Sequence, residues 1–550
     1  MTNNRLSNAV NLFNKKKFDQ SLKILEELHE KEKTNIDILN LISLCCVSLS
    51  KFEEARKFLL LLCDLDKANL NFLNNLAFVY QKLFLFKMAE NTYREIIKKD
   101  KNNLSGYLNL GSLLKRLQKY ESSIEVYQSA IQNNIKSNKL LTNLSSAYLE
   151  SNQINEAITY ASESINLDPN DQLAYINLSS CFIKNKKFDL AINYLNKAKK
   201  INENNPLLYL NYGVLYKNKN EPYEAKKYFN LCIKKNPNTA EAYLYKSLIE
   251  LAENDFKEGW LNYEYRWYAQ KKRIESSVPF WEANSNYKKI LIWGEQGLGE
   301  QILFGSILND MIDKFDKINL VIDPKLKQIF KESFKSIKVL SYEDNWKNED
   351  FDCQLPMGSL GKFFRIDINS FNRSEPYLKI ARSSEKKINQ YLSCGISWKS
   401  VKSIESEEKS INLNDLTPLF ELKDNLNFFN IQYSNIEKEL NEFNLQNNNL
   451  IKNLEGVDLF NDLYGVASHL QNFDFIVTIS NTTAHLSAAL GIPTYLLLSN
   501  NIGRFWYWSN NINGNHLWYK SVKIFRQKNQ GDWGIPIDSL IKYIREAHRI

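Results

Sequence analysis

The 550-residue chain is poor in cysteine, and its cysteines form no pattern that indicates a disulfide framework or a zinc site. The seven cysteines are scattered, only Cys45 and Cys46 are close together, and no CxxC pair occurs. The chain also lacks any run of eighteen apolar residues, and its N-terminus has no basic start followed by an apolar stretch. We therefore expect a cytoplasmic protein without a membrane span, whose cysteines act as small apolar residues.

A strong excess of one charge is missing as well. The formal net charge is only +8, and Lys and Asn are frequent along the whole chain rather than gathered in one patch. Nucleic-acid binding is therefore not expected. An apolar fraction of 43% with 13% aromatic residues argues against disorder. Because the chain is longer than one compact core usually holds, two or three folded units are expected.

A period of 34 residues runs through the first half of the chain. Small residues lie three positions after each member of this series, from Ser21 to Gly259, and a second small series with the same period runs from Ala9 to Ser247. Small side chains at matching positions indicate two helices in close contact. The series itself consists of Phe18, Phe52, Phe86, Tyr120, Ile154, Phe188, Pro222 and Phe256.

This pattern resembles the tetratricopeptide repeat over residues 4–270, in about eight repeats. One such helical hairpin cannot bury its own apolar face, so the repeats are expected to stack into a superhelix with a concave surface. The final unit, "NDFKEGWLNYEYRWYAQKKR", is rich in aromatic residues, among them Trp260 and Trp267. We expect this unit to cap the array by docking onto the following domain.

Five consecutive repeats carry asparagine two residues before the second small series. Stacking would align these amides in a ladder that could hold an extended peptide by its backbone. The array resembles the repeats of protein O-GlcNAc transferases, which carry a comparable ladder. The alternative is that these amides serve turns or solvent contacts. The ladder comprises Asn75, Asn109, Asn143, Asn177 and Asn211.

From residue 288 onward, short apolar runs alternate with helical stretches. The runs "KILIWG", "INLVID", "IKVLS", "CGISW", "NFFNIQY", "DFIVTI" and "TYLLLS" predict buried parallel strands. We expect two Rossmann-like lobes, at residues 288–385 and 390–550, after a linker at 271–287. The second lobe is expected to bind the donor substrate described below.

Two stretches have the form strand, turn, helix. In "ILIWGEQGLGEQILFGSIL", Gly297 and Gly299 permit close backbone approach, although the full GxGxxG pattern is absent. In "DFIVTISNTTAHLSAALGIPTYLLLS", small polar residues begin a helix, whose free N–H groups suit a phosphate. His485 follows in the first turn, where it could reach the phosphate or serve the structure. The polar residues are Ser480, Asn481, Thr482 and Thr483.

Together with "CGISWKS", "KSINLNDLTPLF", "NIQY" and "WYKSVKIFRQ", these stretches resemble bacterial tetratricopeptide-repeat glycosyltransferases. The catalytic half of that class looks like the heptosyltransferase group of the GT-B fold. The resemblance implies transfer of a sugar from a nucleotide-sugar donor to a protein acceptor, such as flagellin, that the repeats recruit. It also implies no metal and no cofactor beyond the donor, and no DxD pair lies at a plausible strand end.

Two departures from the heptosyltransferase pattern concern the site. Glu300 stands where the group has Asp, and Ser480-Asn481 stands where the group usually has Asp-Thr, so the identity of the donor stays open.

Glycosyl transfer needs a base for the acceptor hydroxyl and positive potential for the departing phosphate. Glu300 is the first candidate for the base and Glu295 the second. Lys399, Lys402 or Lys409 would assist the phosphate. Two alternatives remain at this point: a transferase that acts on a glycan or lipopolysaccharide, and a non-catalytic repeat scaffold whose transferase half has decayed.

Overall fold

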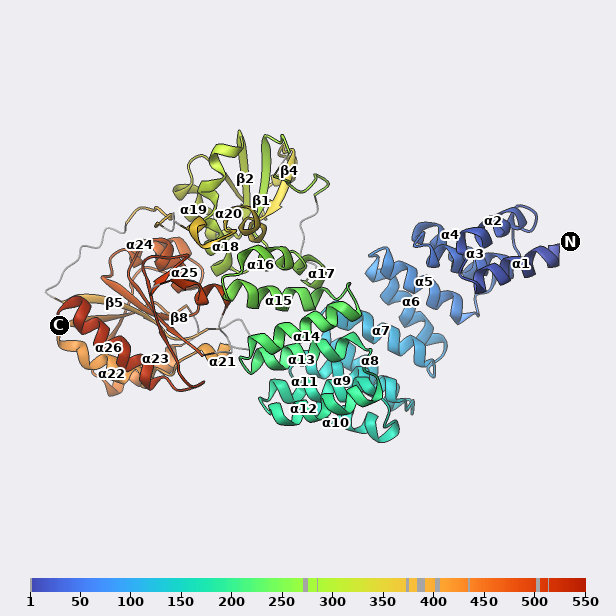
Figure 1. The fold of residues 1–550 in the computed structure, drawn as a ribbon, viewed down its shortest axis with the longest axis horizontal. Helices are drawn as coiled ribbons and strands as arrows, with labels where there is room; N and C mark the ends of the chain where they lie inside the picture. The colour runs from blue at the N-terminus through green and yellow to red at the C-terminus, as the bar shows by residue number, and fades with distance from the viewer. Residues whose placement is uncertain are drawn as a thin grey trace. The chain divides into compact units, whose positions relative to one another are not determined.

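A computed structural model describes residues 2–270, 276–283, 285–371, 375–382, 391–400, 406–433, 436–500, 505–512 and 514–550. The chain divides into two compact units, Met1–Asn211 and Tyr212–Ile550. Figure 1 labels the helices and strands of both. No disulfide joins the cysteines of the described residues, and six of the seven are buried, as expected of small apolar side chains.

The first unit is a stack of helical hairpins. Its helices are α1 (Thr2–Asn14), α2 (Phe18–His29), α3 (Ile36–Ser48), α4 (Phe52–Leu65), α5 (Leu70–Lys82), α6 (Phe86–Lys99), α7 (Leu104–Arg116), α8 (Tyr120–Gln132), α9 (Asn138–Glu150), α10 (Ile154–Leu167), α11 (Gln172–Lys184) and α12 (Phe188–Ile201). The 34-residue series marks the first residue of every second helix from α2 onward. The expected α-solenoid is confirmed.

The two series of small residues face each other within the hairpins. The Ser21 hydroxyl donates to the Ala9 carbonyl at 2.8 Å, and the Ser145 hydroxyl donates to the Ala157 carbonyl at the same distance. A Cβ added to Gly111 would lie 2.3 Å from the Tyr127 ring. Larger side chains would therefore push the paired helices apart, which explains why the period selects small residues.

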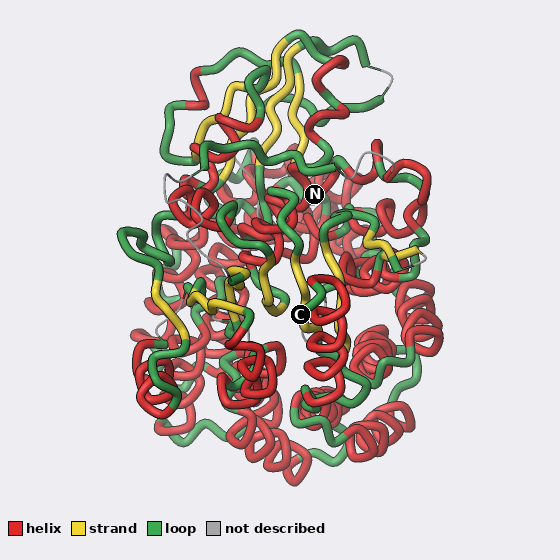
Figure 2. Tube along the Cα trace, turned by 90° about the vertical axis from the view of Figure 1, so that its left-hand side faces the viewer, coloured by secondary structure: helices red, strands yellow, loops and turns green. Residues whose placement is uncertain are grey.

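The second unit begins inside the predicted repeat array. Its first helices are α13 (Pro206–Asn218), which crosses the boundary, α14 (Pro222–Lys235), α15 (Ala240–Ala252), α16 (Phe256–Tyr263) and α17 (Arg266–Gln270). Two parallel sheets follow, and Figure 2 shows their strands in yellow.

The first lobe holds a four-stranded parallel sheet of order β3-β2-β1-β4. Its strands are β1 (Lys289–Trp293), β2 (Lys317–Ile322), β3 (Lys338–Ser341) and β4 (Cys353–Pro356). Its helices are α18 (Leu298–Gly305), α19 (Pro324–Ser333) and α20 (Gly361–Phe364).

The second lobe holds a six-stranded parallel sheet of order β12-β9-β8-β5-β6-β7. Its strands are β5 (Leu392–Ser397), β6 (Leu426–Asn430), β7 (Ile451–Asn453), β8 (Phe475–Ile479), β9 (Thr494–Leu498) and β12 (Val522–Arg526), beside a hairpin of β10 (Asn511–Ile512) and β11 (Asn515–His516). Its helices are α21 (Ser406–Lys409), α22 (Thr417–Phe420), α23 (Glu437–Gln446), α24 (Leu463–Leu470), α25 (Thr482–Ala489) and α26 (Gly534–His548).

All seven expected strands are present, and the α/β architecture with two parallel sheets is confirmed. The sequence-based prediction missed β4, β7 and β12. Strand β7 is short and exposes two of its three residues, so it lacks the apolar run that identified the others.

The aromatic residues of the last repeat form the core between α16 and the lobes, as expected. Trp260 is buried, and its indole N–H donates to the Arg365 carbonyl at 2.8 Å. Its ring packs edge to face against Trp506 of the second lobe at 5.4 Å between centroids. A Cβ on Gly361 would lie 2.3 Å from the Trp260 ring. These contacts make the last repeats part of the second unit.

Each hairpin of the array turns through one left-handed residue, two positions before the next helix of the 34-residue series. Gln118 is one of them, with φ of 61° and an exposed side chain. Gln118→Gly should raise the free energy of unfolding by about 1 kcal/mol, because glycine lacks the Cβ that disfavours this conformation. Chemical denaturation measures the change.

The control is Gln20→Gly inside α2, where the same substitution should lower the stability by about 1 kcal/mol. A stability loss in Gln118→Gly would contradict the prediction.

Candidate functional site

A cavity of about 330 Å³ lies between the two lobes, and we call it the interlobe cavity. Its polar wall is built from residues that directly follow the carboxyl ends of strands in both sheets. Ligands of open parallel sheets bind at this edge. The polar residues are Gln296 and Glu300 after β1, Asp323 and Lys325 after β2, Ser400 after β5, Tyr433 after β6, and Ser480, Asn481, Thr482, Thr483 and His485 after β8.

The turn between β1 and α18 places Glu300 on the cavity wall. The Glu300 carboxylate accepts a hydrogen bond from the Gly297 N–H at 3.1 Å, which caps α18. A Cβ on Gly299 would lie 2.7 Å from the His485 ring, whereas a Cβ on Gly297 would meet only the Glu300 carboxylate, at 3.5 Å. Gly299 thus allows α18 to approach α25, and Gly297 leaves room on the cavity side.

The start of α25 uses two of its four polar residues for the fold. The Ser480 hydroxyl accepts from the Trp508 indole at 3.0 Å. The Asn481 side chain caps α25 by accepting from the Ala484 N–H at 3.1 Å, and it donates to Ser397 of β5 at 2.8 Å.

The other two, Thr482 and Thr483, line the cavity. Burial raises the pKa of Tyr433, and hydrogen bonding to the backbone and hydroxyl of Thr482 opposes this rise. The Tyr433 phenol therefore lies at the mouth of α25.

His485 is buried among aromatic rings. Its Nδ1 lies 3.0 Å from the Tyr519 hydroxyl, and its ring centroid lies 4.7 Å from that of Trp508. Burial lowers the pKa of His485 to about 3, so the ring is neutral at neutral pH. A neutral imidazole adds no positive charge for a phosphate, and its place against Gly299 makes it a packing contact between the lobes.

The three candidate lysines have different surroundings. The ammonium of Lys399 pairs with Glu439 at 2.6 Å, and Lys399 does not line the cavity. Lys402 lies outside the described residues. Lys409 is buried and lines the cavity, with its Nζ 4.6 Å from the centre of the Phe505 ring.

A further lysine, Lys325, lines the cavity from the first lobe and donates to the Phe460 carbonyl at 2.7 Å. The sequence analysis missed it, although its place directly after the strand "INLVID" was a usable signal.

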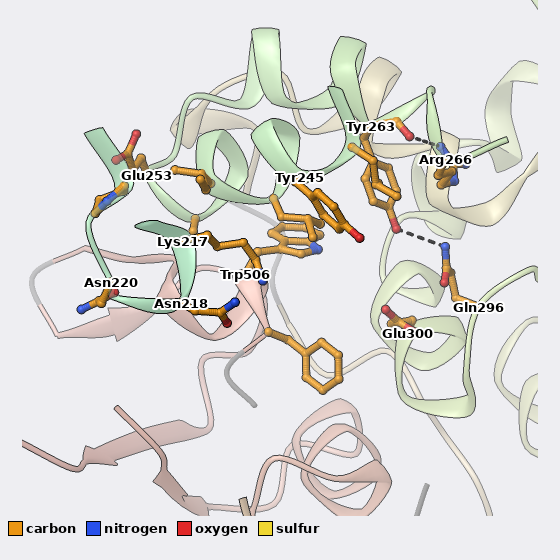
Figure 3. Close-up of a pocket in the computed structure, with 16 residues that line it drawn as sticks. Lys217, Asn218, Asn220, Tyr245, Glu253, Tyr263, Arg266, Gln296, Glu300 and Trp506 are labelled. Atoms are coloured by element: carbon orange, nitrogen blue, oxygen red, sulfur yellow. Dashed lines mark hydrogen bonds between the residues drawn. The ribbon is translucent and has the colours of Figure 1, made fainter. Parts of the chain in front are cut away.

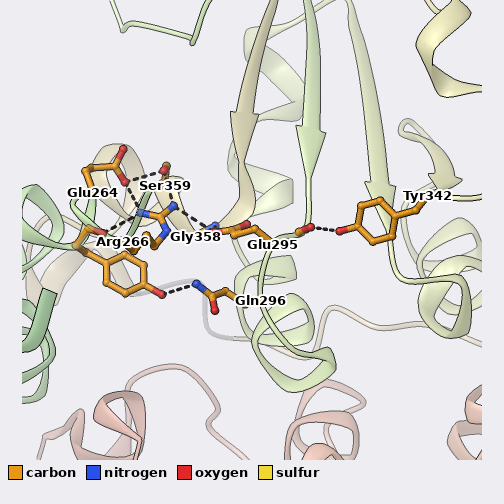
Figure 4. Close-up of polar contacts among 9 residues, drawn as sticks. Glu264, Arg266, Glu295, Gln296, Tyr342, Gly358 and Ser359 are labelled. Atoms are coloured by element: carbon orange, nitrogen blue, oxygen red, sulfur yellow. Dashed lines mark hydrogen bonds and ion pairs between the residues drawn. The ribbon is translucent and has the colours of Figure 1, made fainter. Parts of the chain in front are cut away.

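Glu295 is held in a buried network away from the interlobe cavity (Figure 4). Its Oε1 accepts from Arg266 at 3.1 Å and from the Gly358 N–H at 3.0 Å. Arg266 also pairs with Glu264 at 2.6 Å and donates to Ser359 at 2.7 Å. Burial raises the pKa of Glu295, and the Arg266 charge opposes this rise. The structure thus gives the two candidate bases different environments: Glu300 faces a cavity, and Glu295 joins the last repeat to the first lobe.

The amides of the asparagine ladder are half-buried. The Asn109 side chain donates to Asn74 at 2.8 Å, and that of Asn177 donates to the Thr142 carbonyl at 2.9 Å, both in the preceding repeat. Asn211 accepts from the Ser180 hydroxyl at 2.7 Å. These amides therefore link neighbouring repeats, and their binding of a peptide stays a prediction, as it does for Asn75 and Asn143.

The family model for the tetratricopeptide repeat matches residues 104–134, 139–171, 173–205 and 207–239. The helical part of the chain is built of tetratricopeptide repeats. Protein FlbA of Caulobacter vibrioides is 24% identical over 317 residues, which is 52% of this chain and 52% of that protein. The chain thus aligns with about half the length of that relative.

Two solved structures resemble the chain. A tetratricopeptide repeat protein from Parabacteroides merdae is 17% identical, with 45% of this chain and 98% of that chain covered and a TM-score of 0.41. Pseudomonas aeruginosa pilF is 19% identical, with 40% and 99% covered and a TM-score of 0.32.

Within the described residues, no helix has the length and apolar content to cross a bilayer. The same residues contain no group of three or more His, Cys, Asp or Glu side chains arranged to hold a metal ion.

Breaking the buried pair of Arg266 and Glu295 should destabilise the second unit. Glu295→Gln keeps the size of the side chain but leaves the Arg266 charge less compensated, so we expect a loss of about 3 kcal/mol. Thermal and chemical denaturation measure it. Glu546→Gln is the control, because its pair with Lys542 is exposed and 4.0 Å long. Equal stability of the two variants would contradict the prediction.

Proposed function

We propose that this protein is a glycosyltransferase that moves a sugar from a nucleotide-sugar donor to a protein acceptor recruited by its repeats. The observation that carries the proposal is the position of Glu300. This carboxylate lines the interlobe cavity and also a second cavity of about 390 Å³, which α13 and α15 line from the side of the repeats. A base between a donor cavity and a separate acceptor cavity is what glycosyl transfer needs.

The interlobe cavity suits the diphosphate of a nucleotide sugar. The start of α25 directs backbone N–H groups at the cavity, and Thr482 and Thr483 add hydroxyls. Lys409 of the second lobe and Lys325 of the first lobe add positive charge from two sides. No metal or further cofactor is included in the proposal.

In the proposed reaction, the acceptor hydroxyl oxygen forms a bond with the anomeric carbon of the sugar. The bond from that carbon to the diphosphate oxygen breaks, and its electron pair leaves with the nucleoside diphosphate. Glu300 accepts the hydroxyl proton. The positive groups of the cavity stabilise the charge that develops on the departing diphosphate.

Repeats of this kind favour a protein acceptor, because stacked helical hairpins present extended surfaces for protein partners. A surface protein such as flagellin, modified in the cytoplasm, is the acceptor in this proposal. A transferase acting on a glycan or lipopolysaccharide would share the interlobe cavity but not need the repeats. A scaffold with a decayed transferase half would have no reason to keep a carboxylate and two lysines at one cavity.

The first test concerns the donor. Calorimetric titration with UDP, ADP, GDP and CMP sugars should identify one that binds, and Lys409→Gln should weaken its binding about tenfold, because a hydrogen bond to a charged group is lost. The control is Lys399→Gln, whose ammonium pairs with Glu439 outside the cavity. Failure of every nucleotide sugar to bind would favour the scaffold.

The second test concerns the base. Glu300→Gln can still accept the hydrogen bond from the Gly297 N–H but cannot take a proton. We expect kcat to fall about 100-fold to 10,000-fold with little change in donor affinity. Glu258→Gln on the exposed surface of α16 is the matched control. A kcat near that of the unmodified protein would remove Glu300 from the base role.

A further inference from the structure

The second cavity, which we call the repeat-side cavity, is enclosed by three parts of the second unit (Figure 3). Helices α13 and α15 form the first wall, where Tyr245 and Lys217 lie. Glu300 of the first lobe lies on another wall. Trp506, from the 3₁₀ turn η8 (Trp506–Ser509), contributes the third.

The wall formed by α15 occupies the register of the asparagine ladder. One repeat of 34 residues beyond Asn211 lies Tyr245, so the amide of the ladder is replaced here by an aromatic side chain. Leu248, Ile249 and Ala252 follow Tyr245 on the same helical face, and all four line the cavity. The helix face that carries the ladder in earlier repeats therefore faces Glu300 in this one.

The two cavities share part of their walls. Gln296, Glu300 and Phe505 line both of them. The Gln296 side chain donates to the Tyr263 hydroxyl at 3.2 Å, which ties the turn that carries Glu300 to α16. A group in the repeat-side cavity can thus reach the carboxylate without entering the space for the nucleotide.

From this geometry we infer that the repeat-side cavity is the acceptor subsite, and that it holds an extended polypeptide segment with one hydroxyl-bearing residue at Glu300. Tyr245 packs against the segment as the last rung of the ladder. The inference rests on the proposed transferase function and names where its acceptor binds.

The composition of the cavity favours a polypeptide. The rings of Tyr245 and Trp506 offer flat apolar surfaces, and the amides of Asn218 and Asn220 offer donors and acceptors of the kind that pair with a peptide backbone. Lys217 and Glu253 place charges of both signs on the wall, which differs from the positive potential that a second nucleotide would need.

The reaction at this subsite follows the proposed chemistry. The hydroxyl oxygen of the bound Ser or Thr attacks the anomeric carbon across the shared wall, and Glu300 takes its proton. The diphosphate leaves with the bonding electron pair into the interlobe cavity.

The test uses the full chain, the nucleotide sugar that calorimetry identifies, and a set of synthetic peptides that each carry one Ser or Thr. Tyr245→Ala should raise the KM for peptide about tenfold, and Tyr245→Phe should restore most of the affinity by keeping the ring. Tyr223→Ala is the control, because Tyr223 is 77% exposed on α14. Ala252→Phe fills the cavity by a different change and should raise the peptide KM as well, which guards against misfolding of Tyr245→Ala.

Three results would overturn the inference. Peptide transfer with an unchanged KM in both Tyr245→Ala and Ala252→Phe would place the acceptor elsewhere and leave the proposed function intact. Transfer to a free oligosaccharide but to no peptide would reject the polypeptide and also the protein acceptor of the proposed function. Absence of transfer to either probe, with the donor bound, would reject both as well.

Discussion

The ion pair between Arg266 and Glu295 is the interaction on which the arrangement of the candidate site depends. Both groups are buried, and Arg266 also contacts Glu264 and Ser359. A buried charge is costly unless it is paired, so the last repeat and the end of β1 are stable only when they are together. The turn that follows β1 carries Gln296 and Glu300, so the repeat side of the molecule determines where this turn lies.

The aromatic core around Trp260 has the same effect over a larger area. Trp260 packs on Trp506 of the second lobe and against Gly361 of the first. Asn510 of the second lobe donates to the Leu251 carbonyl at 2.7 Å, at the end of α15. The last repeats thus contact both lobes and supply one wall of the repeat-side cavity. In this protein the repeats are part of the candidate site as well as a partner surface.

The fold could be predicted from the sequence because its signals are local or periodic. The 34-residue period located every second helix to the residue, and seven apolar runs located seven strands. The cavity-lining residues after β1 and β8 were found for the same reason, since polar turns after buried strands are visible in the sequence. Lys325 and Tyr433 follow strands in the same way, but they lie among many polar residues and carry no motif. Strand β7 is too short and too exposed to give a signal.

The sequence by itself determined the repeats, the two parallel lobes and the turns that hold Glu300, Thr482 and Thr483, because these follow from hydrophobic periodicity and glycine placement. Only the tertiary structure decided which of two neighbouring carboxylates faces a cavity. Glu295 and Glu300 lie in one turn and have the same chemistry, and they differ because Arg266, 29 residues away, pairs with the first. Likewise, Lys399 and Lys409 differ only through Glu439 and the packing of Phe505. Charge pairing over such distances depends on how helices and strands pack, and packing is not written in local sequence patterns.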